Sequence, residues 1–177
     1  MDVVCSDKGG PTERAREYVG ALGLQEKVRF CAFDVLADSW TGEPFDVVIL
    51  KSVLGGLGND PDLSSQRIAI NNILLLLRPG GELWFAENLQ ASFLHRACRT
   101  FFVRWGRKWH YFSIGEMRKL LSGFVRATYA CRGFLGAFGR TELQRNWLGR
   151  LDGLFLDRLV PQEWRYIMFG VAVKGQK

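Results

Sequence analysis

The chain has 177 residues, of which 47% are hydrophobic and 24% are charged, and its formal net charge is +6. This balance is that of an ordinary globular domain, and the length allows one substantial core. The longest apolar stretch, residues 73–77, is far too short to cross a bilayer, which excludes a membrane-spanning segment. We therefore expect a cytoplasmic protein.

The cysteines show no pattern typical of a metal site or a disulfide framework. They are widely separated, no Cys-x-x-Cys pair occurs, and the chain has only two histidines. Asp60 and Asp62 lie close together, but in a Gly-Asn-Asp-Pro-Asp loop that suits a turn and a helix cap. We therefore predict reduced core cysteines and no bound metal.

Short strands alternate with helices in the first half of the chain. We predict strands at residues 3–6, 28–33, 45–50 and 83–86, and helices at residues 11–22 and 63–77. Pro11-Thr12-Glu13 is typical of a helix start and Gly23 of a helix end. Strands joined by helices indicate a largely parallel sheet with both faces covered.

The most diagnostic stretch is Arg78-Pro79-Gly80-Gly81, which lies between the second predicted helix and the strand that follows it. Proline lacks an amide donor and stops a helix, and glycine adopts turn conformations that other residues resist. We therefore expect a tight turn at residues 78–81.

The second half of the chain is less regular. Helices are predicted at residues 89–105 and 113–121, and Ser113 with Glu116 has the spacing of a capping box. Strands are expected at residues 125–131 and 166–173, separated by a helix at residues 141–159. The two late strands are expected to pair antiparallel, although a connection of roughly thirty residues is long for a hairpin.

The order strand, strand, helix, Pro-Gly-Gly, strand resembles the back half of a class I S-adenosylmethionine (SAM) dependent methyltransferase. Asp34 at a strand end and Phe45-Asp46-Val47-Val48 belong to the same pattern, which covers residues 2–90 well and the rest loosely. The resemblance implies an α/β, Rossmann-like, mostly parallel sheet with helices on both faces and a late antiparallel strand pair. It also implies one domain over residues 1–177, with residues 89–123 as a helical lid or substrate segment.

The Gly-rich signature of that family, Asp/Glu-x-Gly-x-Gly-x-Gly, does not occur in the chain. Residues 2–7 resemble the family's second strand, so we expect the first strand to be missing. That strand normally lies between the second and fourth strands, and its absence would leave rows of unpaired amides and carbonyls. We expect the neighbouring strands to close up, another chain to fill the gap, or the protein to start upstream of Met1.

Ligands of a parallel sheet bind beyond the carboxyl ends of its strands. The residues at those ends are Asp7, Asp34, residues 51–54 and Glu87. The resemblance implies that Asp7 holds the ribose of S-adenosyl-L-methionine, since a carboxylate accepts hydrogens from both hydroxyls. It also implies that Asp34 accepts the adenine amino hydrogens while the amide of Val35 reaches a ring nitrogen. Alternatively, Asp7 is a charge at a helix N-terminus, with Ser6 in the ribose position, and Asp34 caps its own backbone.

Methyl transfer from a sulfonium is an in-line displacement, to which a protein contributes alignment and, where needed, proton removal. Lys51 follows the strand that in the family runs beneath the transferred methyl, and it is a candidate for the cofactor site or for an anionic part of the substrate. It would act as a base only if it were desolvated, and otherwise it simply ends a strand. His95, His110 and Tyr111, in the lid segment, are the other candidates for a base.

Residues 93–132 are strongly basic and rich in aromatic side chains. The cations, opposed by Glu116 alone, are Arg96, Arg99, Arg104, Arg107, Lys108, Arg118, Lys119, Arg126 and Arg132. Such a segment attracts an anionic membrane surface, a polyanion or a phosphorylated substrate, or it is a solvated helix face over an aromatic core.

The sequence thus predicts a SAM-dependent methyltransferase that acts on a small molecule, a lipid or a saccharide. A second hypothesis is a non-catalytic partner subunit of the same fold that no longer holds cofactor. A third is a binding module whose basic aromatic residues 93–112 dock on a membrane or on nucleic acid.

Overall fold

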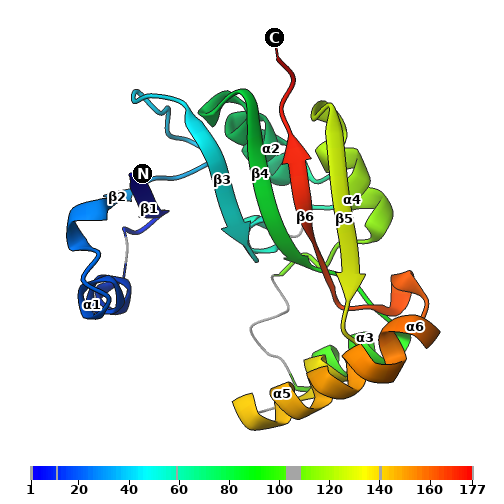
Figure 1. Ribbon diagram of the computed structural model, residues 1–177. Helices are drawn as coiled ribbons and strands as arrows, with labels where there is room; N and C mark the ends of the chain where they lie inside the picture. Colours follow the sequence, from blue (N-terminus) through cyan, green and yellow to red (C-terminus); the bar gives the residue numbers. More distant parts are fainter. Residues whose placement is uncertain (1, 11, 59, 103–108, 140, 177) are drawn as a thin grey trace. The chain divides into compact units, whose positions relative to one another are not determined.

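The computed structural model describes residues 2–10, 12–58, 60–102, 109–139 and 141–176 (Figure 1). The chain forms two compact units, Met1–Gly42 and Glu43–Lys177. Within the described ranges, no helix has both the length and the apolar character that crossing a membrane requires.

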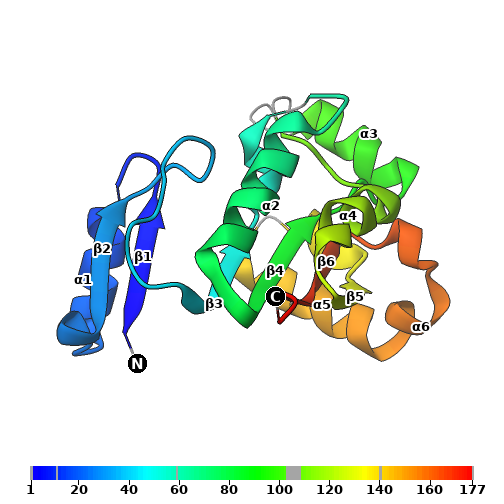
Figure 2. The ribbon, with the colours of Figure 1, turned by 90° about the horizontal axis from the view of Figure 1, so that it is seen from above.

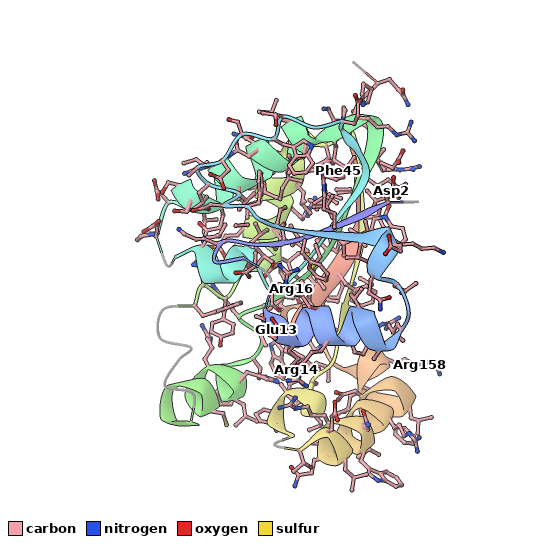
Figure 3. All side chains as sticks on the ribbon, turned by 90° about the vertical axis from the view of Figure 1, so that its left-hand side faces the viewer. Asp2, Glu13, Arg14, Arg16, Phe45 and Arg158 are labelled. Atoms are coloured by element: carbon pink, nitrogen blue, oxygen red, sulfur yellow. The ribbon has the colours of Figure 1, made fainter. Side chains whose placement is uncertain are left out.

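The first unit is a parallel strand pair with one helix. β1 (Val3–Asp7) pairs with β2 (Val28–Ala32), and Asp7 lies opposite Ala32 at the carboxyl end of the pair. α1 (Glu13–Ala21) connects them, followed by a short 3-10 helix, η1 (Gln25–Lys27). Thr12 caps α1, because its hydroxyl accepts the N–H of Ala15 at 3.3 Å, and Figure 3 shows Glu13, Arg14 and Arg16 on this helix.

The second unit contains a four-stranded sheet in the order β3-β4-β6-β5. Its strands are β3 (Phe45–Lys51), β4 (Leu77–Asn88), β5 (Arg126–Arg132) and β6 (Ile167–Val173). β3 and β4 are parallel, and β6 runs antiparallel to both β4 and β5. The α/β class and the late antiparallel strand pair are therefore confirmed.

Helices cover one face of this sheet and extend beyond one of its ends. α2 (Ser64–Leu76) and α4 (Ile114–Leu120) lie on the same face of the sheet (Figures 1 and 2). α3 (Phe93–Phe102), α5 (Glu142–Leu151) and α6 (Asp157–Leu159) lie beyond the end where β3 and β5 finish (Figure 1). A π-helical segment (Asp152–Leu156) joins α5 to α6. Short 3-10 helices of this unit lie at Leu54–Leu57, Leu121–Gly123, Leu135–Phe138 and Gln162–Trp164.

The core of the second unit lies between the sheet and the helices α2 and α4. Ile73 of α2, Leu83 of β4 and Met117 of α4 are all buried. Burying one such side chain contributes about 1.5–3 kcal/mol. Ser113 and Glu116 form the predicted capping box of α4, since each side chain accepts the other residue's backbone N–H.

The sequence predicted a tight turn at residues 78–81, between a helix and a short strand. The structure does not show this simple turn. β4 already begins at Leu77, directly after α2, and Phe45 of β3 pairs with Leu77 while Val47 pairs with Glu82. The Pro-Gly-Gly stretch is therefore a bulge within a longer strand. Proline cannot donate to the ladder, and Gly80 has φ of 73°, so the chain leaves the pairing there and returns at Glu82.

Two predicted helices also end at other positions. The helix predicted at residues 89–105 begins only at Phe93, and residues 103–108 lie outside the described part of the chain. The helix predicted at residues 141–159 begins after Thr141, but is interrupted by the π-helical segment from Asp152.

Among the described residues, β1 pairs only with β2 and β3 pairs only with β4. Each of these two strands therefore has an edge beside which the described residues place no further strand. Ile49 of β3 is 71% exposed, and Trp84, its partner in register on β4, is 46% exposed. Apolar side chains thus lie next to the open edge of β3.

Candidate functional site

Asp7 and the residues after β2 are tied together at one end of the first unit. The carbonyl of Asp7 accepts the N–H of Phe33 at 3.1 Å and that of Gly10 at 3.0 Å. Its carboxylate Oδ1 accepts the N–H of Gly9 at 3.1 Å. Because Asp34 directly follows Phe33, the structure brings the two aspartates singled out by the sequence to the same rim.

Asp34 is engaged by both of its carboxylate oxygens. Oδ2 lies 2.8 Å from Nζ of Lys8, and Oδ1 accepts the N–H of Leu36 at 3.0 Å. The hydrogen bond from Lys8 is the main reason why the pKa of Asp34 is lowered, and the bond from Leu36 acts in the same direction. Asp34 thus caps its own backbone, which was the alternative to adenine binding.

Aromatic side chains accompany the loop that begins at Asp34. The rings of Phe33 and Trp40 are 6.0 Å apart in an edge-to-face arrangement, and the guanidinium of Arg29 lies 5.4 Å from the Trp40 ring. Val35, which follows Asp34, is half-buried. The roles of Asp7, Asp34 and Val35 toward a cofactor stay predictions.

In the second unit, Lys51 ends β3 and is exposed to solvent. This exposure suits contact with an anion better than proton removal, which requires a desolvated amine. The next residue, Ser52, adopts φ of 54°, donates its N–H to the carbonyl of Ala86 and accepts the side-chain amide of Asn88 at 3.1 Å. The end of β3 is therefore held against the end of β4.

Glu87, near the end of β4, is a buried acid to which the sequence assigned no role. Its Oε1 accepts the N–H groups of Val53 at 2.8 Å and Leu54 at 2.9 Å, and Oε2 lies 3.5 Å from the N of Gly55. Burial raises the pKa of Glu87, and the backbone bonds oppose that shift. The sequence indicated only that Glu87 lies at the carboxyl end of a predicted strand, directly after the apolar run Leu-Trp-Phe-Ala.

His110 and Tyr111 lie beside the ends of β3 and β4. The N–H of His110 donates to the carbonyl of Gly55 at 2.8 Å, and the N–H of Phe112 donates to that of Asn88 at 3.1 Å. The His110 ring is buried, with Nε2 3.5 Å from Oε1 of Glu116. Of the four candidates for a base or an anion contact, the structure therefore gathers Lys51, His110 and Tyr111 at the same end of the sheet.

His95 makes different contacts. It is 2% exposed, with Nδ1 2.8 Å from the hydroxyl of Ser92 and Nε2 2.8 Å from the carbonyl of Phe134. A carbonyl only accepts, so Nε2 carries the hydrogen and Nδ1 accepts from Ser92. The ring also packs 4.6 Å from that of Phe138. These contacts hold the start of α3 against residues 134–138, and they engage both ring nitrogens.

Asp152 is a second buried acid that sequence reasoning missed. Its carboxylate accepts the N–H groups of Phe134 at 2.9 Å, Leu135 at 2.8 Å and Gly136 at 2.9 Å. It therefore holds the 3-10 helix Leu135–Phe138, and with it the carbonyl that binds His95. The acid and its partners are far apart in sequence, so no local motif reveals them.

Solved structures match the whole chain, whereas neither models of protein families nor curated protein sequences match it. The [4+2]-cyclase SpnF has a TM-score of 0.62 and 16% identity, over 100% of this chain and 67% of its own. The N-methyltransferase NodS from Bradyrhizobium japonicum WM9, in complex with S-adenosyl-L-homocysteine, has a TM-score of 0.54 and 18% identity, over 98% and 66%. A SAM-dependent methyltransferase from Methanosarcina mazei has a TM-score of 0.65 and 15% identity, over 99% and 83%.

The chain has the class I methyltransferase fold. It spans from 44% to 83% of the length of the structures compared. One of them is described as a cyclase, so this fold alone does not assign a reaction.

A cavity of about 330 Å³ follows the end of β4 in this class I fold. Its inner wall includes the buried residues Leu89, Ala91 and Phe112, and exposed side chains at its rim are Phe93, Arg96, Glu163 and Trp164. This volume is within the range of small-molecule sites. Of the basic side chains in residues 93–132, those that the structure describes, including Arg118 and Arg126, are exposed. Arg104, Arg107 and Lys108 lie outside the described residues, and the Arg99 side chain is not described. Membrane or polyanion contact by residues 93–132 stays a prediction.

Proposed function

We propose that this chain is the cofactor- and acceptor-binding part of a SAM-dependent methyltransferase that acts on a small molecule, a lipid or a saccharide. The observation that carries the proposal is the placement of Asp7 and Asp34 at the carboxyl ends of two adjacent parallel strands, β1 and β2. Two acids at such a rim suit a nucleoside, because one matches the paired ribose hydroxyls and the other matches an exocyclic amine.

The donor set fits S-adenosyl-L-methionine with one rearrangement. Asp7 is exposed and would accept the ribose hydroxyls. Asp34 would accept the adenine amino group with Oδ2, which now faces Lys8, while the Val35 amide would reach a ring nitrogen. The Lys8 side chain is 75% exposed, and an ion pair in contact with water is weak enough for an adenine amine to replace it.

When bound, S-adenosyl-L-methionine supplies an electrophilic methyl group, and the protein's part is to align an acceptor and keep water away. The cavity after β4 would hold the acceptor, with Arg96 and Glu163 at its rim for polar groups. Lys51 would bind an anionic part of the cofactor or the acceptor. Tyr111, or His110 supported by Glu116, would take the proton of an acceptor hydroxyl or amine.

The test is calorimetric titration of the chain with S-adenosyl-L-methionine and with S-adenosyl-L-homocysteine. We expect both to bind, and Asp7→Asn and Asp34→Asn each to weaken binding about tenfold, or about 1.4 kcal/mol. Asp2→Asn is the matched control, because Asp2 precedes the amino end of the same strand β1 (Figure 3). The proposal is wrong if neither ligand binds, or if the control weakens binding as much as the other two variants.

A second candidate, a partner subunit, is supported by the open edge of β3 and by the exposed Ile49 and Trp84 beside it. In this case another chain supplies a strand that pairs with β3 and covers these side chains. Absence of SAM binding together with self-association would favour this candidate.

A further inference from the structure

Glu87 lies inside the second unit and is completely buried. A fully buried carboxylate cannot touch a substrate, so Glu87 is not a catalytic residue in the proposed reaction. Its bonds run instead to the backbone of residues 53–55, which directly follow the end of β3. All three of these donors to the Glu87 carboxylate are backbone N–H groups.

Burying an acid at this position costs free energy of folding unless its carboxylate makes compensating interactions. Removing a carboxylate from water without a cation beside it disfavours the charged form, and burial does raise the pKa of Glu87. A neutral side chain of the same size would fill the same space. What it would lose is the negative charge that strengthens the bonds from Val53 and Leu54, and the second oxygen, because an amide presents a donor toward the N of Gly55.

The same turn is held from its other side. The carbonyl of Gly55 accepts the N–H of His110, and a Cβ added to Gly55 would lie 2.6 Å from the His110 carbonyl and would also meet the Trp109 indole. Buried Gln66 donates to the carbonyls of Leu54 at 3.3 Å and Gly58 at 2.9 Å. The turn is thus fixed between Glu87, Gln66 and residues 109–110.

We propose that Glu87 is a positioning residue, which sets the turn at residues 53–55 and, through the bond from His110 to Gly55, the segment that carries His110 and Tyr111. Lys51 and Ser52 immediately precede this turn. One buried carboxylate therefore sets, through this turn, the backbone of the segment that carries two of the candidate bases, His110 and Tyr111. The functional part of this inference rests on the proposed function, but the part that concerns the turn does not.

The test is backbone amide hydrogen exchange, measured by NMR on the wild type and on Glu87→Gln. We expect the exchange of the amides of Val53, Leu54 and His110 to accelerate at least about tenfold, while the unfolding midpoint and the exchange of the β4–β6 ladder change little. Glu82→Gln is the matched control on the same strand, since the Glu82 carboxylate accepts the N–H of the exposed Trp84 indole at 2.7 Å.

The outcomes separate a positioning role from a merely structural one. The inference is overturned if exchange accelerates uniformly and the unfolding midpoint drops strongly. It is also overturned if the three amides exchange within threefold of their wild-type rates. If Glu87→Gln does not fold, Gly55→Ala tests the same turn from the opposite side and is expected to accelerate the same amides. If no SAM derivative binds even the wild type, the proposed function fails, whereas the exchange result still decides the role of Glu87.

Discussion

Lys8 and Asp34, which follow the neighbouring strands β1 and β2, form an ion pair with Nζ and Oδ2 2.8 Å apart. The pair joins the two strand ends at the rim where a nucleoside would bind. It also occupies the oxygen that the proposed function assigns to the adenine amino group. Lys8 and the cofactor therefore compete for Asp34.

This competition predicts that Lys8→Gln strengthens the binding of S-adenosyl-L-homocysteine, on the order of threefold, because a surface ion pair is only weakly favourable. Isothermal titration calorimetry measures the change. Lys27→Gln is the control, since Lys27 is exposed in the same unit and precedes β2 at its other end. Unchanged or weaker binding by Lys8→Gln would show that Lys8 does not compete for this site.

The buried Glu87 predicts an unusual dependence of stability on pH. Burial raises its pKa above the ordinary value of 4.5, so the folded protein holds this proton at pH values where the unfolded chain has lost it. Its contribution to stability is complete below the unfolded pKa and is lost as pH rises through the folded one. The wild type should therefore gain stability relative to Glu87→Gln as the pH falls from neutral to the ordinary glutamate pKa of 4.5. Thermal unfolding of both proteins across this range measures the difference, and a constant or opposite difference contradicts it.

Asp152 predicts a large loss of stability on removal. Asp152→Ala would leave the N–H groups of Phe134, Leu135 and Gly136 without their acceptor, at a cost of about 3 kcal/mol. Urea unfolding gives this value. Glu142→Ala, in the exposed first turn of α5, should cost less than about 1 kcal/mol. Equal effects of the two substitutions would show that the buried acid has no special part in the fold.

The open edge of β3 makes a prediction for the second candidate function. If a second copy covers this edge, light scattering gives a mass above the 20.1 kDa of one chain, and Ile49→Lys restores the monomer because an unpaired ammonium resists burial. Leu75→Lys is the control, since Leu75 of α2 is similarly exposed at 79%. A wild type that is monomeric at all concentrations excludes pairing between copies.

The sequence predicted the helices and strands that are specified by neighbouring residues, such as helix caps and short apolar runs. Ser113 caps α4 as expected, α1 begins within the predicted start Pro11-Thr12-Glu13, and the apolar runs at β2 and β3 form strands within one residue of their predicted ends. The two aspartates could be placed on one rim because adjacent parallel strands end together. The bulge at Pro79 was not predictable in the same way, since it depends on where β3 pairs with β4.

The hydrogen-bond partners of the buried residues Glu87, Asp152 and His95 could not be predicted from the sequence, for a physical reason. Glu87 binds residues more than thirty positions away, and Asp152 binds residues sixteen to eighteen positions away, so their partners are set by packing and not by spacing along the chain. His95 looked like a candidate base in the sequence, yet its ring nitrogens bind Ser92 and Phe134. A histidine's role depends on such contacts, which no periodicity reveals.

The central claim, that Asp7 and Asp34 bind the nucleoside of a SAM-type cofactor, is tested most directly by following backbone amide NMR signals during titration with S-adenosyl-L-homocysteine. The account predicts saturable shifts of the signals from residues 7–10 and 33–36, with much smaller shifts in the β5–β6 ladder. Saturable binding that leaves residues 7–10 and 33–36 unshifted, or no shifts at all, would contradict it.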